Sequence, residues 1–431
     1  MKNTFKKIIV KILTWESKLI LARYHPKIIA ITGSVGKTST KDAIYSVISE
    51  FYTVRKSEKS FNSEIGLPLT ILGVKNGWSN PGIWIENILR GLFLILWKNK
   101  YPEWLVLEIG AGKPGDIKGV APWLKPDVVV LTRFPDVPVH VEFFGTTEKI
   151  IEEKMALAHA LRKNGVLIVN HDDQRVFNSH QIVDRRTVSY GVNDHATYKA
   201  SYPIINIEPI GNDNPSGLTF KLAHNGNTFP VHMPHIIGQT HMYCGLAAIA
   251  VASEIGCDIL KSIEALKNYK TPKSRLTMIE GVNKSIIIDD TYNASPVAME
   301  AALFVLETTP AKRKIAVLGD MLELGKRTEE AHNEIGLQAS RVADIIVLVG
   351  PRAKFIGDGA KANKFKEKNI YYFDSSITCG KFLAGIVEEG DVILLKGSQG
   401  VRLERAVEAI MANPSEAKSL LCRQEKEWKS R

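Results

Sequence analysis

The segment TGSVGKTSTK (32–41) carries glycines, a lysine and hydroxyl groups at a spacing suited to binding nucleotide phosphates. Glycines let backbone N–H groups approach phosphate oxygens, and the N-terminus of a following helix favours negative charge. Lys37 can neutralise the β- and γ-phosphates, and Thr38 can ligate Mg²⁺. The predicted ATP-phosphate site therefore consists of Gly33, Ser34, Val35, Gly36, Lys37, Thr38 and Ser39.

The flanking sequence supports this interpretation, although the strict GxxxxGK[ST] motif is not met. Ile31 occupies the place of the first glycine of that motif, so the loop is shorter and begins at Gly33. A GKT triplet can follow a strand by chance. Here the buried-strand pattern KIIAIT (27–32) precedes the loop and a helical pattern follows from Lys37, which is the strand–loop–helix context that phosphate binding needs.

Strand-like runs alternate with helical patterns along most of the chain, which predicts parallel α/β sheets. Residues 186–236 differ, because short β-type runs are separated by Gly, Asn and Pro, which is typical of an antiparallel meander. The segment YKTPKSR (269–275) is typical of an interdomain linker. We expect an α/β protein with a P-loop-type central ATPase domain, mostly parallel and carrying a β-meander insertion, followed by a Rossmann-like domain.

The predicted boundaries divide the chain into four parts. A basic amphipathic helix or arm covers 1–26, the ATP-binding domain covers 27–270, the Rossmann-like domain covers 271–413, and a charged tail that frays as a helix covers 414–431. The strands predicted for the two domains lie at 27–32, 104–110, 127–132 and 165–170, and then at 285–290, 314–320, 344–350, 369–373 and 391–397.

Further motifs occur in a fixed order after the phosphate loop. They are FNSEIGLPLTIL (61–72), LEIGA (107–111), HVEFFGTTEKIIEEK (140–154), DDTYNASPVAM (289–299), GDMLELG (319–325) and KGSQGVRLE (396–404). Together with the short loop they resemble the Mur ligase family, the ATP-dependent amino-acid ligases of cell-wall synthesis. The resemblance covers about residues 27–412, and it is greatest to the MurF branch, which adds D-alanyl-D-alanine to a UDP-linked muramoyl tripeptide.

The resemblance implies that ATP phosphorylates a carboxylate and that an amine then attacks the acyl phosphate. Two Mg²⁺ ions would offset the charge, with Glu108 and His140 as ligands. Lys154 matches a lysine that is often carbamylated in this family, and a carbamate is an anion that can ligate Mg²⁺ where an ammonium cannot. Asn62 and Ser63 match a loop that contacts substrate and metal, although Asn62 is also a good helix N-cap.

In the second domain, the resemblance gives Arg275 a contact with the ATP phosphates and Asp290 a ribose- or hinge-binding role. Tyr292 and Asn293 follow it in the substrate-binding pattern, and Lys396 and Ser398 would hold the carboxylate of the incoming amino acid. His332 matches a histidine of the family but could equally be a helix-surface residue. Cys244 stands where the family usually has an asparagine that contacts adenine, which puts that contact in doubt.

The front of the chain departs from the MurF pattern. Only 26 residues precede the first strand, where that branch carries a domain that holds the uridine nucleotide, so we expect that domain to be absent. The acceptor could be a UDP-linked muropeptide bound differently, a lipid-linked peptide or a pseudomurein precursor. The partner molecules we expect are a small-molecule or lipid-linked wall precursor and an amino acid or dipeptide.

The first 27 residues hold seven basic side chains against Glu16 alone, which is more than half of the net charge of +10. Trp78, Trp84, Trp97 and Trp104 crowd a second apolar stretch. Two interpretations are open for 1–26 and 78–104: helices packed on the core, or peripheral contact with anionic lipid. Residues 1–26 lack the pattern of a signal peptide, and the apolar run 83–97 is shorter than a membrane span.

Four scattered cysteines fit a reducing environment, so we expect a cytoplasmic location with possible membrane association. No recognition motif for nucleic acid accompanies the basic residues. Alternative functions are a folylpolyglutamate-, poly-glutamate- or pseudomurein-type ligase, or a non-catalytic nucleotide-binding partner in a wall-synthesis complex. The DDTYNA and GDMLELG motifs favour the MurF branch, and the intact Lys37, Glu108 and Lys154 favour an enzyme.

Overall fold

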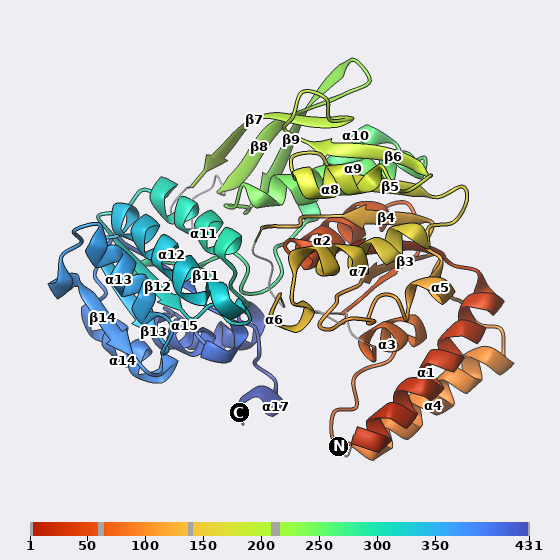
Figure 1. The fold of residues 1–431 in the computed structure, drawn as a ribbon, viewed down its shortest axis with the longest axis horizontal. Helices are drawn as coiled ribbons and strands as arrows, with labels where there is room; N and C mark the ends of the chain where they lie inside the picture. Colours follow the sequence, from red (N-terminus) through yellow and green to blue (C-terminus); the bar gives the residue numbers. More distant parts are fainter. Residues whose placement is uncertain (1–2, 59–63, 137–140, 208–215, 430–431) are drawn as a thin grey trace.

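We analysed a computed structural model of the chain, which describes residues 3–58, 64–136, 141–207 and 216–429. Two α/β units, each built on its own sheet, lie side by side and are joined near residue 270 (Figure 1). The predicted fold class is confirmed. The described residues include no helix with both the length and the apolar character needed to cross a membrane.

The first sheet has the strand order β2-β3-β1-β4-β5-β6-β7-β8-β9, and its pairs are parallel from β2 to β7. Its strands are β1 Lys27–Thr32, β2 Val54–Lys56, β3 Trp104–Glu108, β4 Val128–Leu131, β5 Val166–Asn170, β6 Arg186–Gly191, β7 Tyr198–Asn206, β8 Gly217–His224 and β9 Asn227–Pro234. The antiparallel meander is therefore narrower than predicted, because β6 pairs parallel with β5 and β7. Only β7, β8 and β9 run antiparallel.

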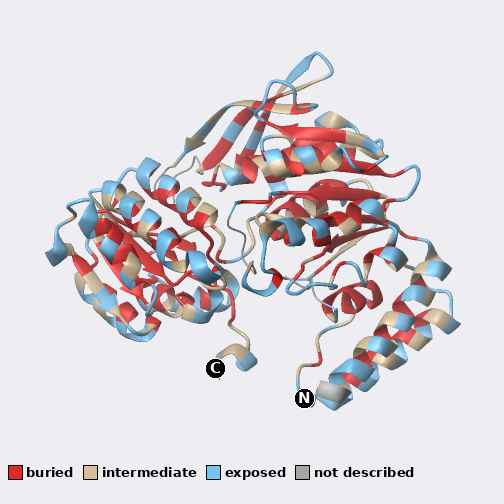
Figure 2. Cartoon of the chain, in the orientation of Figure 1, coloured by how far each residue is buried: buried red, intermediate tan, exposed pale blue. Residues whose placement is uncertain are grey.

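Helices cover both faces of this sheet because its strands are apolar on both sides (Figure 2). One face packs on helices α2 Lys37–Ile48, α9 Thr240–Glu254 and α10 Ile259–Ala265. The other face packs on α1 Asn3–Tyr24, α3 Gly66–Leu72, α4 Pro81–Leu96, α5 Ala121–Leu124, α7 Thr147–His159 and α8 Gln174–His180. Burial of alternate strand residues into separate cores fixes the register of each strand.

The second sheet has the order β10-β11-β15-β12-β13-β14, with only β10 antiparallel. Its strands are β10 Thr277–Glu280, β11 Ile286–Asp290, β12 Arg313–Gly319, β13 Ile345–Val349, β14 Ile370–Phe373 and β15 Asp391–Lys396. Helices α11 Pro296–Thr308, α12 Thr328–Val342 and α13 Lys354–Ala362 cover one face, and α14 Ser376–Ile386, α15 Glu404–Ile410 and α16 Ala417–Leu420 cover the other. The short edge strands β10 of this sheet and β2 of the first sheet were not predicted from the sequence.

The C-terminal tail is not the frayed helix that its charge predicted. Ala417, Leu421, Cys422 and Arg423 are buried, and the tail folds back on the second domain before the short helix α17 Lys426–Lys429. Apolar residues between the charges explain the difference, because they complete the core beneath α14 and α15.

Helices α1 and α4 form a pair at the edge of the first domain, far from the second domain (Figure 1). The Tyr24 hydroxyl donates to the carbonyl of Leu94 (2.9 Å), so the two C-terminal ends lie together and the helices run parallel. Each helix leads directly into a strand, α1 into β1 and α4 towards β3, and those strands are parallel neighbours. Within the described residues, the stretches 1–26 and 78–104 thus each contain a helix that packs on the core, as the first of the two interpretations predicted.

Glu16 lies inside the helix pair and is fully buried. Its carboxylate faces Gly91 of α4, where an added Cβ atom would lie 2.3 Å from Glu16 Oε2. Neither carboxylate oxygen has a hydrogen-bond partner among the described residues, and burial raises the pKa of the Glu16 carboxyl to about 7. Gly91 is therefore required for close packing, and Glu16 is neutral when the pair is most stable.

Replacing Glu16 by Gln tests this assignment. In the folded protein the pKa of the Glu16 carboxyl lies above its ordinary value. The protonated form therefore stabilises the fold at low pH, and this stabilisation is lost as the pH rises through about 7. Between about pH 5 and about pH 8, the wild type should lose about 1–3 kcal/mol of unfolding free energy relative to Glu16→Gln. Urea denaturation at several pH values measures this. Glu86→Gln, on the exposed side of α4, should leave the pH dependence unchanged; an equal effect of both substitutions would contradict the assignment.

Candidate active site at the carboxyl ends of the parallel strands

The phosphate loop occupies a switch point of the first sheet. Strand β1 lies between β3 and β4, and residue pairs Ile31–Glu108 and Thr32–Leu131 are in register. The connections that follow β1 and its neighbour β4 lead to helices on opposite faces of the sheet, α2 and α7, and such a divergence opens a crevice at the carboxyl ends of the strands. The loop, Glu108 and Thr132 meet there, as the sequence predicted for the first two.

Two glycines of the loop adopt backbone conformations that other residues rarely adopt. Gly33 has φ 149°, and an added Cβ would lie 1.9 Å from Thr132 Oγ1. Gly36 has φ 84° and precedes the first residue of α2. The Thr132 hydroxyl also donates to the carbonyl of Val35 (2.7 Å), so β4 holds the loop in place.

Two lysines from distant elements meet at this loop, the half-buried Lys37 and the buried Lys154. The Lys37 ammonium donates to the carbonyls of Gly33 (2.8 Å) and Ser34 (3.3 Å). Lys154, from α7, donates to Ser34 Oγ (2.7 Å). Burial lowers the pKa of Lys154 well below its usual range, and repulsion from Lys37 adds to this shift. Burial also lowers the pKa of Lys37, while the Glu108 carboxylate opposes the shift.

Glu108 is a buried carboxylate at the end of β3, and a third lysine approaches it. Lys41, one turn after the phosphate-binding part of α2, places its Nζ atom 4.0 Å from Glu108 Oε2 and 3.5 Å from Asp42 Oδ1. Burial lowers the Lys41 pKa, and the Asp42 and Glu108 carboxylates counteract this. The sequence analysis missed Lys41, although its position in GKTSTK places it on the same helix face as Lys37.

The residue before Lys154 orders the loop that follows β3. Glu153 Oε1 accepts hydrogen bonds from the backbone N–H groups of Ile117 (2.7 Å) and Lys118 (2.9 Å), and Oε2 accepts from Gly115 (3.0 Å). A carboxylate bound by several N–H groups fixes the backbone around it. Sequence reasoning missed Glu153, since its three partners are at least 35 residues away.

Arg275 connects the two domains at the site. Its Nη2 atom donates to Thr38 Oγ1 (3.3 Å), and its guanidinium group stacks 4.3 Å from the centre of the Tyr292 ring. Arg275 thus links the phosphate loop of the first domain to residues 291–294 of the second domain, called the TYNA segment. A second contact between the domains joins α6 Val141–Phe144 to the turn Gly325–Arg327.

Asp290 and Lys396 form a buried ion pair in the second domain. Their strands are parallel neighbours with these two residues in register, and Lys396 Nζ lies 2.5 Å from Asp290 Oδ2. Lys396 also donates to the carbonyl of Asn293 (2.9 Å), and the N–H group of Leu276 donates to Asp290 (3.3 Å). The pair therefore ties the linker to the TYNA segment; Lys396 is directed at Asp290 in this arrangement.

His332 and Ser398 both hold the GDM loop. The Met321 N–H group donates to His332 Nε2 (2.9 Å), so Nδ1 carries the proton and donates to the Thr328 carbonyl (2.6 Å). His332 is fully buried, which excludes the surface interpretation. Ser398 Oγ accepts from the Leu322 N–H group (2.9 Å). Both residues position backbone in this structure.

Cys244 is a residue of α9 that faces Thr40 of α2, the helix that follows the phosphate loop. Its thiol is buried and lies within 3.6 Å of Thr40 Oγ1, and burial raises the Cys244 pKa to about 11. Three other predicted residues, Asn62, Ser63 and His140, lie outside the described residues. No group of three or more His, Cys, Asp or Glu side chains suited to a metal ion occurs within the described ranges.

Both domains of the chain are similar to domains of known proteins. Residues 31–252 match the model of the Mur ligase middle domain, and residues 274–399 match the model of the Mur ligase glutamate ligase domain. The chain belongs to the Mur ligase family. A UDP-N-acetylmuramoyl-tripeptide–D-alanyl-D-alanine ligase of Bacillus subtilis is 31% identical over 404 residues, which cover 92% of this chain and 79% of the relative.

Two further similarities concern an Escherichia coli protein and a solved structure. The Escherichia coli ligase of the same name is 25% identical, over 94% of this chain and 80% of its own length. The MurF ligase of Thermotoga maritima, solved with ADP, has a TM-score of 0.75 and 27% identity, covering 95% of this chain and 84% of that one. This Mur ligase is an ATP-dependent ligase that forms carbon–nitrogen bonds, and it resembles the MurF branch as predicted.

The C-terminal tail of this Mur ligase supplies a contact that no motif indicated. Arg423 donates to the carbonyls of Thr291 (3.3 Å) and Tyr292 and to Glu404 Oε2 (3.2 Å). Its guanidinium group lies 5.2 Å from the Tyr292 ring. Tyr292 is therefore held between Arg275 and Arg423, and the tail positions the segment that faces the phosphate loop.

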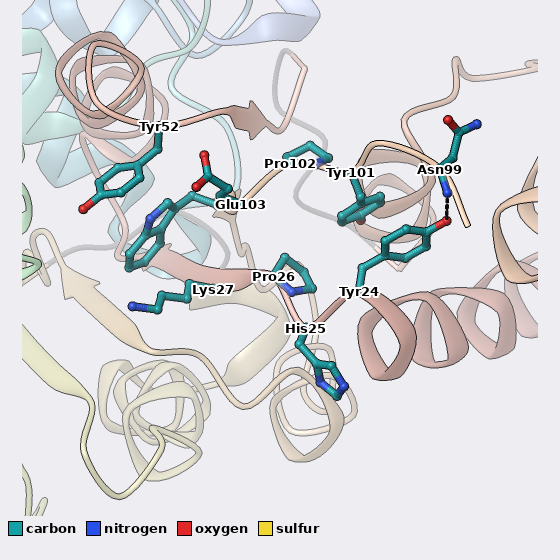
Figure 3. Close-up of a pocket in the computed structure, with 10 residues that line it drawn as sticks. Tyr24, His25, Pro26, Lys27, Tyr52, Asn99, Tyr101, Pro102 and Glu103 are labelled. Carbon is teal, nitrogen blue, oxygen red and sulfur yellow. Dashed lines mark hydrogen bonds between the residues drawn. The ribbon is translucent and has the colours of Figure 1, made fainter. Parts of the chain in front are cut away.

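A separate hollow of this Mur ligase lies at the opposite end of the first sheet, around the starts of β1 and β3 (Figure 3). Tyr24 and Tyr101 stack there with ring centres 4.6 Å apart, and Tyr24 accepts a hydrogen bond from the Asn99 N–H group (3.1 Å). Parallel sheets bind ligands at the carboxyl ends of their strands, so we assign no reaction to this hollow. Its aromatic pair fixes the ends of α1 and α4.

Arg275→Lys tests the link between the domains. Lysine keeps the positive charge but lacks the planar group that stacks on Tyr292 and donates to Thr38. We expect kcat/KM for ATP to fall about tenfold or more, mainly through KM. Steady-state ADP release measures this. Arg162→Lys, at an exposed site of the first domain, should have no effect; unchanged ATP kinetics in Arg275→Lys would contradict the assignment.

Proposed function

We propose that this Mur ligase joins D-alanyl-D-alanine to the carboxylate of a wall-precursor peptide and converts ATP to ADP and phosphate. The observation that carries the proposal is the convergence of Lys37, Lys154 and Glu108 at the switch point, with Arg275 brought in from the second domain. The choice of D-alanyl-D-alanine rests on the names of the relatives that match along both domains.

The chemistry places a triphosphate, a carboxylate and a developing oxyanion in one pocket. Lys37 and the backbone N–H groups of the loop would hold the β- and γ-phosphates, and Arg275 would offset charge at the transferred phosphoryl group. The acceptor carboxylate attacks the γ-phosphorus and ADP leaves. The dipeptide amine then attacks the acyl carbon, and phosphate leaves. Contact of Arg275 with Thr38 supports closure of the domains as the step that assembles this site.

The residues at the loop fit a magnesium site. Thr38, Glu108 and a carbamylated Lys154 would be ligands, with His140 as a further candidate from the sequence. The Lys154 amine is buried beside another lysine, and its lowered pKa favours the neutral form that reacts with carbon dioxide. Carbamylation converts a cation into an anion next to Lys37, which relieves the repulsion between the two lysines. When bound, Mg²⁺ would shield the negative charge of the phosphates.

Asn62 and Ser63 remain proposed contacts of the acceptor, and Tyr292 and Asn293 those of the incoming dipeptide. Lys396 and Ser398 would act at the dipeptide's carboxylate, and their contacts with Asn293 and Leu322 support a place at that end of the site. The proposal includes peripheral membrane contact through residues 1–26 and 78–104. A lipid-linked precursor is therefore a candidate acceptor beside the UDP-linked tripeptide.

The assignment of the reaction is tested by a screen of ADP release. UDP-linked and lipid-linked muramoyl peptides are combined with D-alanyl-D-alanine, D-alanine or L-glutamate. We expect release with D-alanyl-D-alanine, and a loss of about a thousandfold or more in Lys37→Ala and Glu108→Ala, because the charge stabilisation is removed. Release with L-glutamate alone would point to a poly-glutamate ligase, and no release with any pair would contradict the proposal.

Carbamylation of Lys154 is tested by chemical rescue. Lys154→Ala removes the carbamate, so turnover should fall about a hundredfold or more, and formate or acetate should partly restore it by supplying a carboxylate ligand. Lys149→Ala, on the exposed side of the same helix, is the matched control and should remain active without added acid. Normal turnover of Lys154→Ala would exclude the carbamate.

A further inference from the structure

Helices α1 and α4 present large apolar side chains to solvent. On α4 they are Ile85 (60% exposed), Leu89 (60%), Phe93 (46%) and Leu96 (63%), and on α1 they are Ile8 (52%) and Trp15 (53%). These six residues are called the outer face below. Spacings of three, four and seven residues place each set on one side of its helix.

Both sets face solvent, away from the core of the first domain. Glu16 of α1 and Gly91 of α4 mark the line where the helices meet. At about 100° per residue, Ile8 and Trp15 lie about 80–100° to one side of this line on α1. On α4, Ile85 and Leu96 lie about 120–140° from the line, on the side that points the same way in parallel helices, and Leu89 and Phe93 lie nearly opposite the line. The buried Leu13, Ser17 and Leu94 fall on the other side, towards the protein core.

Positive charge borders the outer face along α1, whereas α4 carries one exposed acidic residue, Glu86, beside it. Lys7, Lys11 and Lys18 follow one another along α1 at spacings of four and seven residues, next to the side that carries Ile8 and Trp15. The one acidic residue of α1, Glu16, is buried at the helix contact. An apolar face flanked by lysines and containing Trp and Phe is typical of helices that lie in a membrane interface.

We infer that the outer face docks on an anionic lipid bilayer, with α1 and α4 lying in the plane of the interface. The net positive charge of this border, three lysines against Glu86, argues for lipid headgroups, because a second copy of the chain would bring two surfaces of like net charge together. The pair projects from the edge of the first domain, so a flat surface can reach it (Figures 1 and 2). Lipid docking needs no spanning helix.

This inference deepens the proposed membrane contact by naming the surface and its lipid class, and it rests on that part of the proposed function. A bilayer-bound enzyme would meet a lipid-linked acceptor at the membrane. Neither the helix pair nor the outer face contributes to the phosphate loop. Lipid binding and ADP release can therefore fail separately.

Co-sedimentation of the full chain with vesicles tests the inference. We expect binding to vesicles of phosphatidylcholine mixed with phosphatidylglycerol, and at least about tenfold weaker binding to phosphatidylcholine alone. Leu89→Ser with Leu96→Ser should weaken binding to anionic vesicles about tenfold or more, as should Lys7→Gln with Lys11→Gln and Lys18→Gln. The matched control is Ile182→Ser with Leu260→Ser, two residues with 66% and 61% exposure at other sites, which should bind like the wild type.

Thermal unfolding and ADP release with a soluble acceptor show whether each variant is folded and active. Negligible binding of the wild type to anionic vesicles would overturn the inference, as would equal binding of the Leu89/Leu96 variant. A concentration-dependent dimer in light scattering that the same two substitutions dissociate would also overturn it, and would identify a second copy as the occupant. If ADP release fails while vesicle binding persists, the ligase assignment is wrong and the docking face stands.

Discussion

The candidate active site depends on holding three basic groups close together at the phosphate loop. Lys37, Lys154 and Arg275 come from the phosphate loop, α7 and the interdomain linker, and their mutual repulsion disfavours bringing them together in the absence of negative charge. Glu108 offsets part of this repulsion from the end of β3. The negative phosphates of ATP would offset most of the rest, so the repulsion that makes this arrangement costly to form would also favour the binding of a polyanion.

The rest of the architecture fixes the backbone around this charge. Thr132 holds the loop from β4, Glu153 holds the segment after β3, and the buried pair of Asp290 and Lys396 holds the linker from which Arg275 projects. Each support is a buried polar contact between adjacent strand ends or between a helix and a loop. Such contacts are strong only with good geometry, which the strand register of both sheets provides.

Among the described residues, the helix pair at the edge of the first domain is held by apolar packing and not by buried charge contacts. One side of α1 and α4 completes the core, while the other leaves large apolar groups exposed beside lysines. Both interpretations drawn from the sequence therefore apply to the same helices: packing accounts for one side, and our lipid proposal concerns the other. Composition alone could not divide the residues between the two sides, because the division depends on which neighbour each helix meets.

The sequence by itself determined the phosphate loop, the alternation of strands and helices, the linker and the family. Local patterns carry this information: glycine spacing, apolar periodicity and short motifs are properties of neighbouring residues. It also identified Lys37, Glu108, Lys154 and Arg275, because each lies in such a motif.

Only the tertiary structure decided which of these residues meet and which support them. Glu153, Lys41 and Arg423 act through partners far along the chain, and His332 became a buried backbone-positioning residue once the GDM loop folded over it. The tail packs because its few apolar residues meet a core that a linear pattern does not describe. These contacts depend on burial between residues far apart in the sequence and on strand register. The spacing of neighbouring residues does not determine either of them.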